Sequence, residues 1–178
     1  MTRAQSRKRK DAARVPLTRL GLKAKRWLDQ LADPKPIATK DPRSAWHFRA
    51  TYPAGSSHVM HVASPHKKPD TLIIASVLTI TQTQFDAFSQ LPDESKENLL
   101  WALRFRLNSV ETDFRLDGVA GPLDCPTRIL TSVVRYEDGL SLDSFARSLG
   151  AVYKTELLAS WTIFRHLSRE PHVSMEYR

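Results

Sequence analysis

The spacing of hydrophobic and polar positions along this chain of 178 residues switches between helical and strand-like periods, which predicts an α+β fold. Apolar residues recur at helical spacing over 16–32, and a proline-rich linker follows over 33–44. Apolar and polar side chains then alternate over 46–52, and 58–63 and 72–80 predict two further strands. The last of these is apolar at both alternating sets of positions, so we expect it at the centre of the sheet.

The second half of the chain repeats the change of period. Two short helices separated by Pro92 are predicted up to about Asn108, and 110–117 and 128–136 have the alternation of strands. Ser141 is a good N-cap for a long last helix. The expected inner side of that helix consists of Leu142, Phe145, Leu149, Val152, Leu158, Trp161 and Phe164. An antiparallel sheet of about five strands with helices on one face accounts for this order, α-βββ-αα-ββ-α.

The charge of the chain is concentrated in its first quarter. Residues 1–44 hold 13 Lys and Arg against 4 Asp, a balance of +9, whereas 45–178 hold 14 basic against 15 acidic residues. Residues 1–15 are too poor in apolar side chains to repay ordering, so we expect a disordered basic tail ahead of one domain over 16–178.

A polyanion is the partner that such an arm suits best. Lys and Arg bind phosphates without reading sequence, and we expect residues 1–26 to contact RNA in a ribonucleoprotein setting. The alternative is a tail that only aids solubility. The residues expected to make the contact are Arg3, Arg7, Lys8, Arg9, Lys10, Arg14, Arg19, Lys23 and Arg26.

The order and hydrophobic placement of these elements resemble a known fold group. The stretches that carry the resemblance are Trp46–Tyr52, Val59–Ala63, Leu72–Ile80, Phe85–Leu91, Leu99–Leu107, Phe114–Leu116 and Ile129–Tyr136. They resemble the type III secretion chaperone-like fold, a group that also holds the YbjN-like proteins and an uncharacterised archaeal family of domains of unknown function. The resemblance implies a non-enzymatic, chaperone-like protein that binds a protein partner along a sheet or helix groove and forms a homodimer. The basic leader differs from the acidic character usual in secretion chaperones.

Histidine and cysteine give weak signals for chemistry. His58 and His61 are three apart on an expected strand, so they point to opposite faces and cannot hold one metal ion together. Cys125 is the only cysteine and has Asp124 beside it, which would raise rather than lower the thiol pKa. We therefore expect ordinary exposed histidines, a loop or strand-edge thiol at Cys125, and neither metal nor cofactor.

Acidic residues cluster on one expected strand, where Glu111, Asp113 and Asp117 alternate with apolar positions. Such alternation is typical of any strand with one face in water. The 6 glycines form no phosphate-binding loop. We predict that the protein is not an enzyme; the alternative is a small enzyme with a hidden polar site near His47 and His61 or on the strand of Glu111 and Asp113.

The composition also bears on location. No apolar run approaches the ~20 residues that span a bilayer, and a single cysteine suits a reducing compartment. We expect a cytoplasmic protein, or one of the mitochondrial matrix if the basic leader is a transit peptide.

Overall fold

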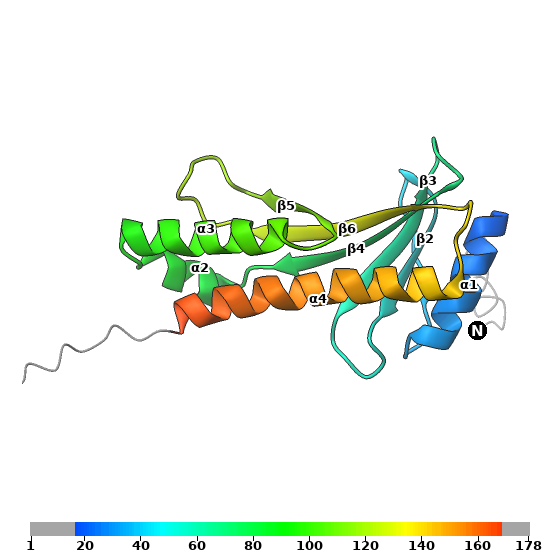
Figure 1. Ribbon diagram of the computed structural model, residues 1–178, viewed down its shortest axis with the longest axis horizontal. Helices are drawn as coiled ribbons and strands as arrows, with labels where there is room; N and C mark the ends of the chain where they lie inside the picture. The colour runs from blue at the N-terminus through cyan, green and yellow to red at the C-terminus, as the bar shows by residue number, and fades with distance from the viewer. Residues whose placement is uncertain (1–16, 169–178) are drawn as a thin grey trace, which may run out of the picture.

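The computed structural model describes residues 17–168 as four helices and one antiparallel sheet (Figure 1). In chain order the elements are α1 (Arg19–Leu31), β1 (Ile37–Ala38), β2 (Ser44–Thr51), β3 (Val59–Pro65), β4 (Thr71–Thr79), α2 (Gln82–Ser89), α3 (Asp93–Asn108), β5 (Asp113–Asp117), β6 (Arg128–Tyr136) and α4 (Leu142–Leu167). The six strands lie in the order β1-β2-β3-β4-β6-β5. The predicted α+β class and the central place of β4 are confirmed.

The sheet has one strand more than the sequence predicts, because β1 lies inside the proline-rich linker. It is only two residues long and pairs at the edge of the sheet, Ile37 opposite Arg49 and Ala38 opposite Phe48. Prolines are tolerated beside an edge strand, since its outer side needs no ladder hydrogen bonds. A strand of only two residues, in a segment rich in proline, is too short to show the alternation of apolar and polar positions by which strands are predicted.

The start of β5 also differs from the prediction, which began that strand at Val110. Residues 110–112 bend instead. Thr112 turns inward there, and its Oγ1 donates to Thr155 Oγ1 at 3.0 Å. This bond fixes the link between α3 and β5 against α4.

One face of the sheet is covered by helices. Along β2, β3, β4 and β6 the side chains on this face are buried, and α4 runs along β4 and β6 with α3 beside it (Figure 1). The largest of these side chains are Trp46, Phe48, Met60, Val62, Leu72, Ile74, Ile129 and Val133. α1 packs across β2 and the start of α4, so all three helices lie on the same side.

A polar layer divides the core beneath α4 into two hydrophobic clusters. One cluster holds Phe145 and α1, and the other holds Ile163 and α3. Between them, Glu156 of α4 is buried and accepts hydrogen bonds from Ser76 Oγ and, at 2.9 Å, from His58 Nδ1. A buried carboxylate is tolerated only when it is paired in this way.

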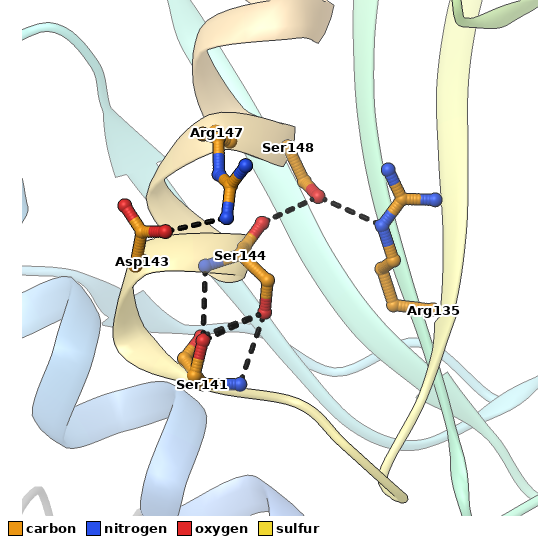
Figure 2. Close-up of polar contacts among 6 residues, drawn as sticks. All are labelled: Arg135, Ser141, Asp143, Ser144, Arg147 and Ser148. Carbon is orange, nitrogen blue, oxygen red and sulfur yellow. Dashed lines mark hydrogen bonds and ion pairs between the residues drawn. The ribbon is translucent and has the colours of Figure 1, made fainter.

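The N-terminus of α4 is held by serines, as Figure 2 shows. Ser141 Oγ accepts from the Ser144 backbone N–H at 3.2 Å, and Ser144 Oγ accepts from the Ser141 N–H at 3.0 Å. Ser148 lies one helical turn after Ser144, and its Oγ accepts a hydrogen bond from Arg135 Nε at 3.0 Å. This bond ties the helix to β6. The predicted N-cap is confirmed, and α4 is fixed to the sheet at its first turns.

Among residues 17–168, no helix is both long and apolar enough to cross a membrane.

Candidate functional site

The second face of the sheet, which we call the open face, is covered by no helix of the described chain. Its apolar side chains come from three neighbouring strands: Ala63 of β3, Ile73, Ala75 and Val77 of β4, and Leu130 and Val134 of β6. The register sets Ile73 opposite Val134 and Val77 opposite Leu130, so these side chains form a continuous strip. Val77 is 39% exposed and Val134 38% exposed. The central strand β4 is apolar on both sides, and helices cover only one of them.

The open face is hollowed next to β2, where residues 39–44 form a wall beside it. Ala63 and Ala75 are among the apolar residues of β3 and β4 that form the floor of this hollow. The wall and rim carry the cationic side chains Lys40, Arg43 and Arg49, which are all exposed. The hollow thus combines an apolar floor with a positively charged rim.

The one carboxylate of the wall, Asp41, is engaged by its neighbours. It accepts hydrogen bonds from Ser44 Oγ at 2.7 Å and from the backbone N–H of Arg43 at 3.1 Å. These bonds, that of Ser44 first, hold the pKa of Asp41 below its ordinary value. Arg43 Nε also lies 3.5 Å from this carboxylate. Asp41 shapes the wall, and Lys40 and Arg49 keep the rim cationic.

Two histidines meet at the edge of the hollow. His47 Nε2 and His61 Nδ1 are 3.0 Å apart, and the ring centroids are 5.2 Å apart. Burial lowers the pKa of both side chains, and for His61 the charges of His47 and Arg49 lower it further. The pair is therefore neutral at pH 7.

The tautomer of this pair follows from the surroundings of His47. Its Nδ1 is buried and has no hydrogen-bond partner among residues 17–168. Burying an N–H donor without a partner is rarer than burying an acceptor in this way. We therefore place the proton on His47 Nε2, which donates to His61 Nδ1 and leaves His61 Nε2–H as the outer donor.

The predicted basic residues of α1 lie in two kinds of surroundings. Arg19 Nε is 4.0 Å from Glu137 Oε1 with its side chain largely in water, and Lys23 Nζ donates to the Leu140 carbonyl at 3.4 Å. Arg26 is exposed on the same helix. Two of the three cations thus face the turn between β6 and α4 rather than open solvent alone. The other predicted contacts, Arg3, Arg7, Lys8, Arg9, Lys10 and Arg14, lie outside the described residues.

The other histidines differ from the sequence-based expectation in part. His66 is exposed, as expected. His58 instead lies half-buried against Tyr153, with ring centroids 5.0 Å apart, and donates to Glu156. His58 and His61 do point to opposite faces of the sheet, and the residues that the structure describes contain no cluster of three metal-ligating side chains.

The acidic strand does not form a common site with the histidines. Asp113 is opposite Ser132 and is three strands, roughly 14 Å, away from His61 along the same row. Asp117 accepts from Arg115 Nε at 2.7 Å and from Arg128 Nη2 at 3.2 Å, and the bond from Arg115 lowers its pKa. Glu111 precedes the strand. These residues form surface ion pairs at the far rim of the open face.

Cys125 packs at the edge of the small cluster of Phe88, Leu99 and Leu100. Burial raises the pKa of its thiol. Asp124 does not approach it as a base, because its Oδ2 accepts from the backbone N–H groups of Ala120 and Gly121. These surroundings are those of a structural thiol.

Comparison with known proteins gives relatives of undetermined activity. Residues 22–163 match the model of a family described as uncharacterized conserved protein (DUF2299). The crystal structure of an uncharacterized protein from Methanothermobacter thermautotrophicus is 26% identical, with a TM-score of 0.73, and the match covers 82% of this chain and 97% of that chain. No curated protein matches. These findings agree with the uncharacterised archaeal family that the sequence resembles, and they give no support to the chaperone-like group.

Proposed function

The chain belongs to this family of uncharacterised conserved proteins, and we propose that it is a non-enzymatic binding protein that holds a segment of a protein partner on its open face. Its basic N-terminal arm contacts a polyanion, RNA in a ribonucleoprotein setting. By holding a segment of a partner on its open face, the protein acts in the manner of a chaperone or adaptor.

The observation that carries the proposal is the uncovered apolar strip on β4 and β6. Antiparallel sheets usually place polar side chains on the face that water reaches. Here Ile73, Val77, Leu130 and Val134 lie on that face, while charged residues surround them. An apolar centre within a polar rim is the usual composition of a protein–protein interface.

The rim charges indicate what kind of segment binds. Lys40, Arg43 and Arg49 line one side of the hollow, and Asp41 is held by Ser44 and Arg43. On the opposite rim, Asp117 is paired with two arginines. A partner segment with an apolar stripe and carboxylates along one edge satisfies both the floor and the rim. We therefore propose an acidic amphipathic segment as the bound element.

The arm contributes a separate contact. Its support is the +9 balance of residues 1–44, together with the exposed Arg26 on α1. Because Arg19 and Lys23 have neighbours on the β6–α4 turn, most of the binding is assigned to the cations before α1. Contact with phosphates releases counterions, so the affinity should fall steeply with salt.

The open face can be tested with designed peptides. An amphipathic helix with Glu flanks is compared with the same helix carrying Lys flanks, by fluorescence anisotropy on the full chain. The Glu peptide should bind, and Val77→Lys should weaken it at least tenfold. Leu142→Lys is the matched control, because Leu142 is 38% exposed on α4. Equal affinity for both peptides, or no effect of Val77→Lys, would contradict the proposed docking face.

The arm is tested by binding generic RNA across a salt series. Deletion of residues 1–14 removes six cations and should abolish most of the salt dependence, while the circular dichroism of the body stays the same. Unchanged RNA affinity after this deletion would refute the role of the arm.

A second candidate function rests on the His47–His61 pair, which could pass a proton within the hollow. This reading makes the protein a small acid–base enzyme. A screen of model ester, phosphate-ester and glycoside substrates tests it. Turnover that is lost in both His47→Gln and His61→Gln would establish an enzyme in place of the binding protein.

A further inference from the structure

Hydrogen-bond donors from two neighbouring strands meet at one corner of the hollow. Arg49 of β2 is directly opposite His61 of β3, so the two side chains lie next to each other on the open face. His47 is two residues before Arg49 on the same strand, and its Nε2 donates to His61 Nδ1 at 3.0 Å. The guanidinium of Arg49 and His61 Nε2–H therefore remain to bind a ligand. We call Arg49 and His61 the donor corner.

The charged residues around the donor corner leave an excess of positive charge. Lys40, Arg43 and Arg49 line the hollow, and Asp41 is the one carboxylate among the described residues that line it, so three cations against one anion give +2. Asp41 is already engaged by Ser44 Oγ and by Arg43. Neither Lys40 nor Arg49 forms an ion pair with another of the residues 17–168. A ligand group with two negative charges would balance the hollow.

The donor corner suits one compact oxyanion better than a carboxylate. A guanidinium binds two oxygens of the same group at once, and the neighbouring His61 Nε2–H can donate to a third. A phosphoryl group offers three acceptor oxygens and a charge of about −1.5 to −2 at pH 7. A carboxylate has only two oxygens and one charge. A phosphoryl group therefore uses every donor of the corner and matches the excess charge.

The apolar floor next to the donor corner indicates what carries the phosphoryl group. Ala75 of β4 is directly opposite His61, and Ile73 follows on the same face. The strip then continues to Val134 of β6, which is opposite Ile73, lies outside the hollow and is 38% exposed. A small free phosphate would leave this strip in water. A partner segment covers the strip and reaches the corner with one side chain.

We propose that the donor corner binds a phosphoryl group on the partner segment, so that phosphorylation of the partner strengthens its docking on the open face. Arg49 and His61 contact the phosphoryl oxygens, and Lys40 and Arg43 of the wall supply the remaining positive charge. This inference rests on the proposed function, because it assigns one group of the segment that the open face holds.

A divalent metal ion is the other ligand that two close histidines suggest, and the charges of the hollow oppose it. Arg49 lies beside His61, and Lys40 and Arg43 line the same hollow, so a cation would be repelled. The described chain also holds no group of three metal-ligating side chains. The same charges attract an oxyanion.

Three peptides that differ at one position test the proposal. Each is the Glu-flanked amphipathic helix of the docking experiment, with serine, glutamate or phosphoserine placed in turn at each flanking position. Fluorescence anisotropy on the full chain gives the dissociation constants. At the flanking position that reaches the corner, the phosphoserine peptide should bind about tenfold more tightly than the serine peptide, and more tightly than the glutamate peptide.

The ratio of the serine and phosphoserine dissociation constants isolates the contact with the corner. In Arg49→Gln the ratio should fall to about threefold or less, and Arg49→Lys should keep only part of it, because lysine has the charge without the planar fork. Arg165→Gln is the matched control, since Arg165 is an exposed arginine in the last turn of α4, and the ratio should stay the same. A variant that only disturbs the fold weakens both peptides alike, and circular dichroism checks that each variant is folded.

The outcomes separate this inference from the proposed function. If the serine and phosphoserine peptides bind equally and Val77→Lys weakens both, the docking face stands and the phosphoryl site is overturned. A ratio that is unchanged in Arg49→Gln also overturns it. If no peptide binds, phenyl phosphate is titrated instead. Binding that is lost in Arg49→Gln then replaces the proposal with a site for a free organic phosphate, and no binding of either ligand overturns both proposals.

Discussion

Two glycines in helices should respond in opposite ways to alanine, although helix propensity favours alanine at both. Gly21 lies in the first turn of α1 and Gly150 lies within α4. Glycine costs about 0.5–1 kcal/mol relative to alanine in a helix interior. Propensity alone therefore predicts that Gly21→Ala and Gly150→Ala both stabilise the fold.

The space around each glycine decides the outcome. A Cβ on Gly21 would lie 2.9 Å from Trp46 Nε1 and 3.0 Å from its Cδ1, inside the normal contact distance. A Cβ on Gly150 would meet nothing closer than Tyr52 Oη at 3.9 Å. The indole of Trp46 cannot give way easily, because it is buried and donates to Thr18 Oγ1 at 2.9 Å.

The expected magnitudes follow from these contacts. Overpacking a core costs typically 1–3 kcal/mol, and the propensity gain offsets up to ~1 kcal/mol of this. Gly21→Ala should therefore destabilise the chain by about 1–2 kcal/mol, whereas Gly150→Ala should stabilise it by about 0.5–1 kcal/mol. Urea unfolding followed by far-UV circular dichroism measures both. Equal stabilisation by the two substitutions would refute the close approach of α1 to Trp46.

Three further predictions concern the core and the histidines. Leu78→Asp should destabilise the body by about 3 kcal/mol or more, because Leu78 packs against the hydrophobic cluster that holds Ile163 and α3, opposite Ile129. A cooperative unfolding curve with the wild-type urea midpoint would contradict this prediction. Glu156→Ala leaves Ser76 without its acceptor and should cost about 2 kcal/mol or more in the same assay, while equal stability would show that the polar layer needs no carboxylate. The pKa values of His47 and His61 are lowered in the fold, so the unfolded chain takes up protons first as the pH falls below their ordinary 6.5. Stability should therefore fall from pH 7 to 5, and the double variant His47→Gln and His61→Gln should flatten this fall.

The sequence predicted the elements whose residues follow one strong period. The predicted ends of β4 and β6 agree with the observed ends to within one residue. Their apolar positions are continuous, and turns bound both strands. The last helix was placed correctly from Ser141, yet its expected inner side was partly wrong, because Leu142, Trp161 and Phe164 are exposed. Apolar character alone cannot tell a buried side chain from one that awaits a partner.

The polar pairs could not be predicted from local patterns, since they depend on register. His47 is opposite Ala63, and His61 lies two residues away on the same face, so the two rings are diagonal neighbours. A shift of one residue would place them on different faces. Glu156 did leave a signal, because it interrupts the apolar side of α4 between Val152 and Ala159. A charged residue at such a position points to a buried partner, here His58.

The open face and the outer side of α3 lie on opposite sides of the molecule, so substitutions on one side can be used as controls for the other. Side chains of β4 that point toward the helices complete the core, and those that point away form the open face. Trp101 and Phe105 point away from the sheet on the outer side of α3, whose inner side is buried by Leu103 and Leu107. Residues on the outer side of α3 are therefore remote from the open face and from the acidic segment that we propose binds there. Substitution of Val77 by Lys should weaken binding of the acidic segment, and Trp101→Lys should leave that binding unchanged, because Trp101 lies in water on the far side of the molecule.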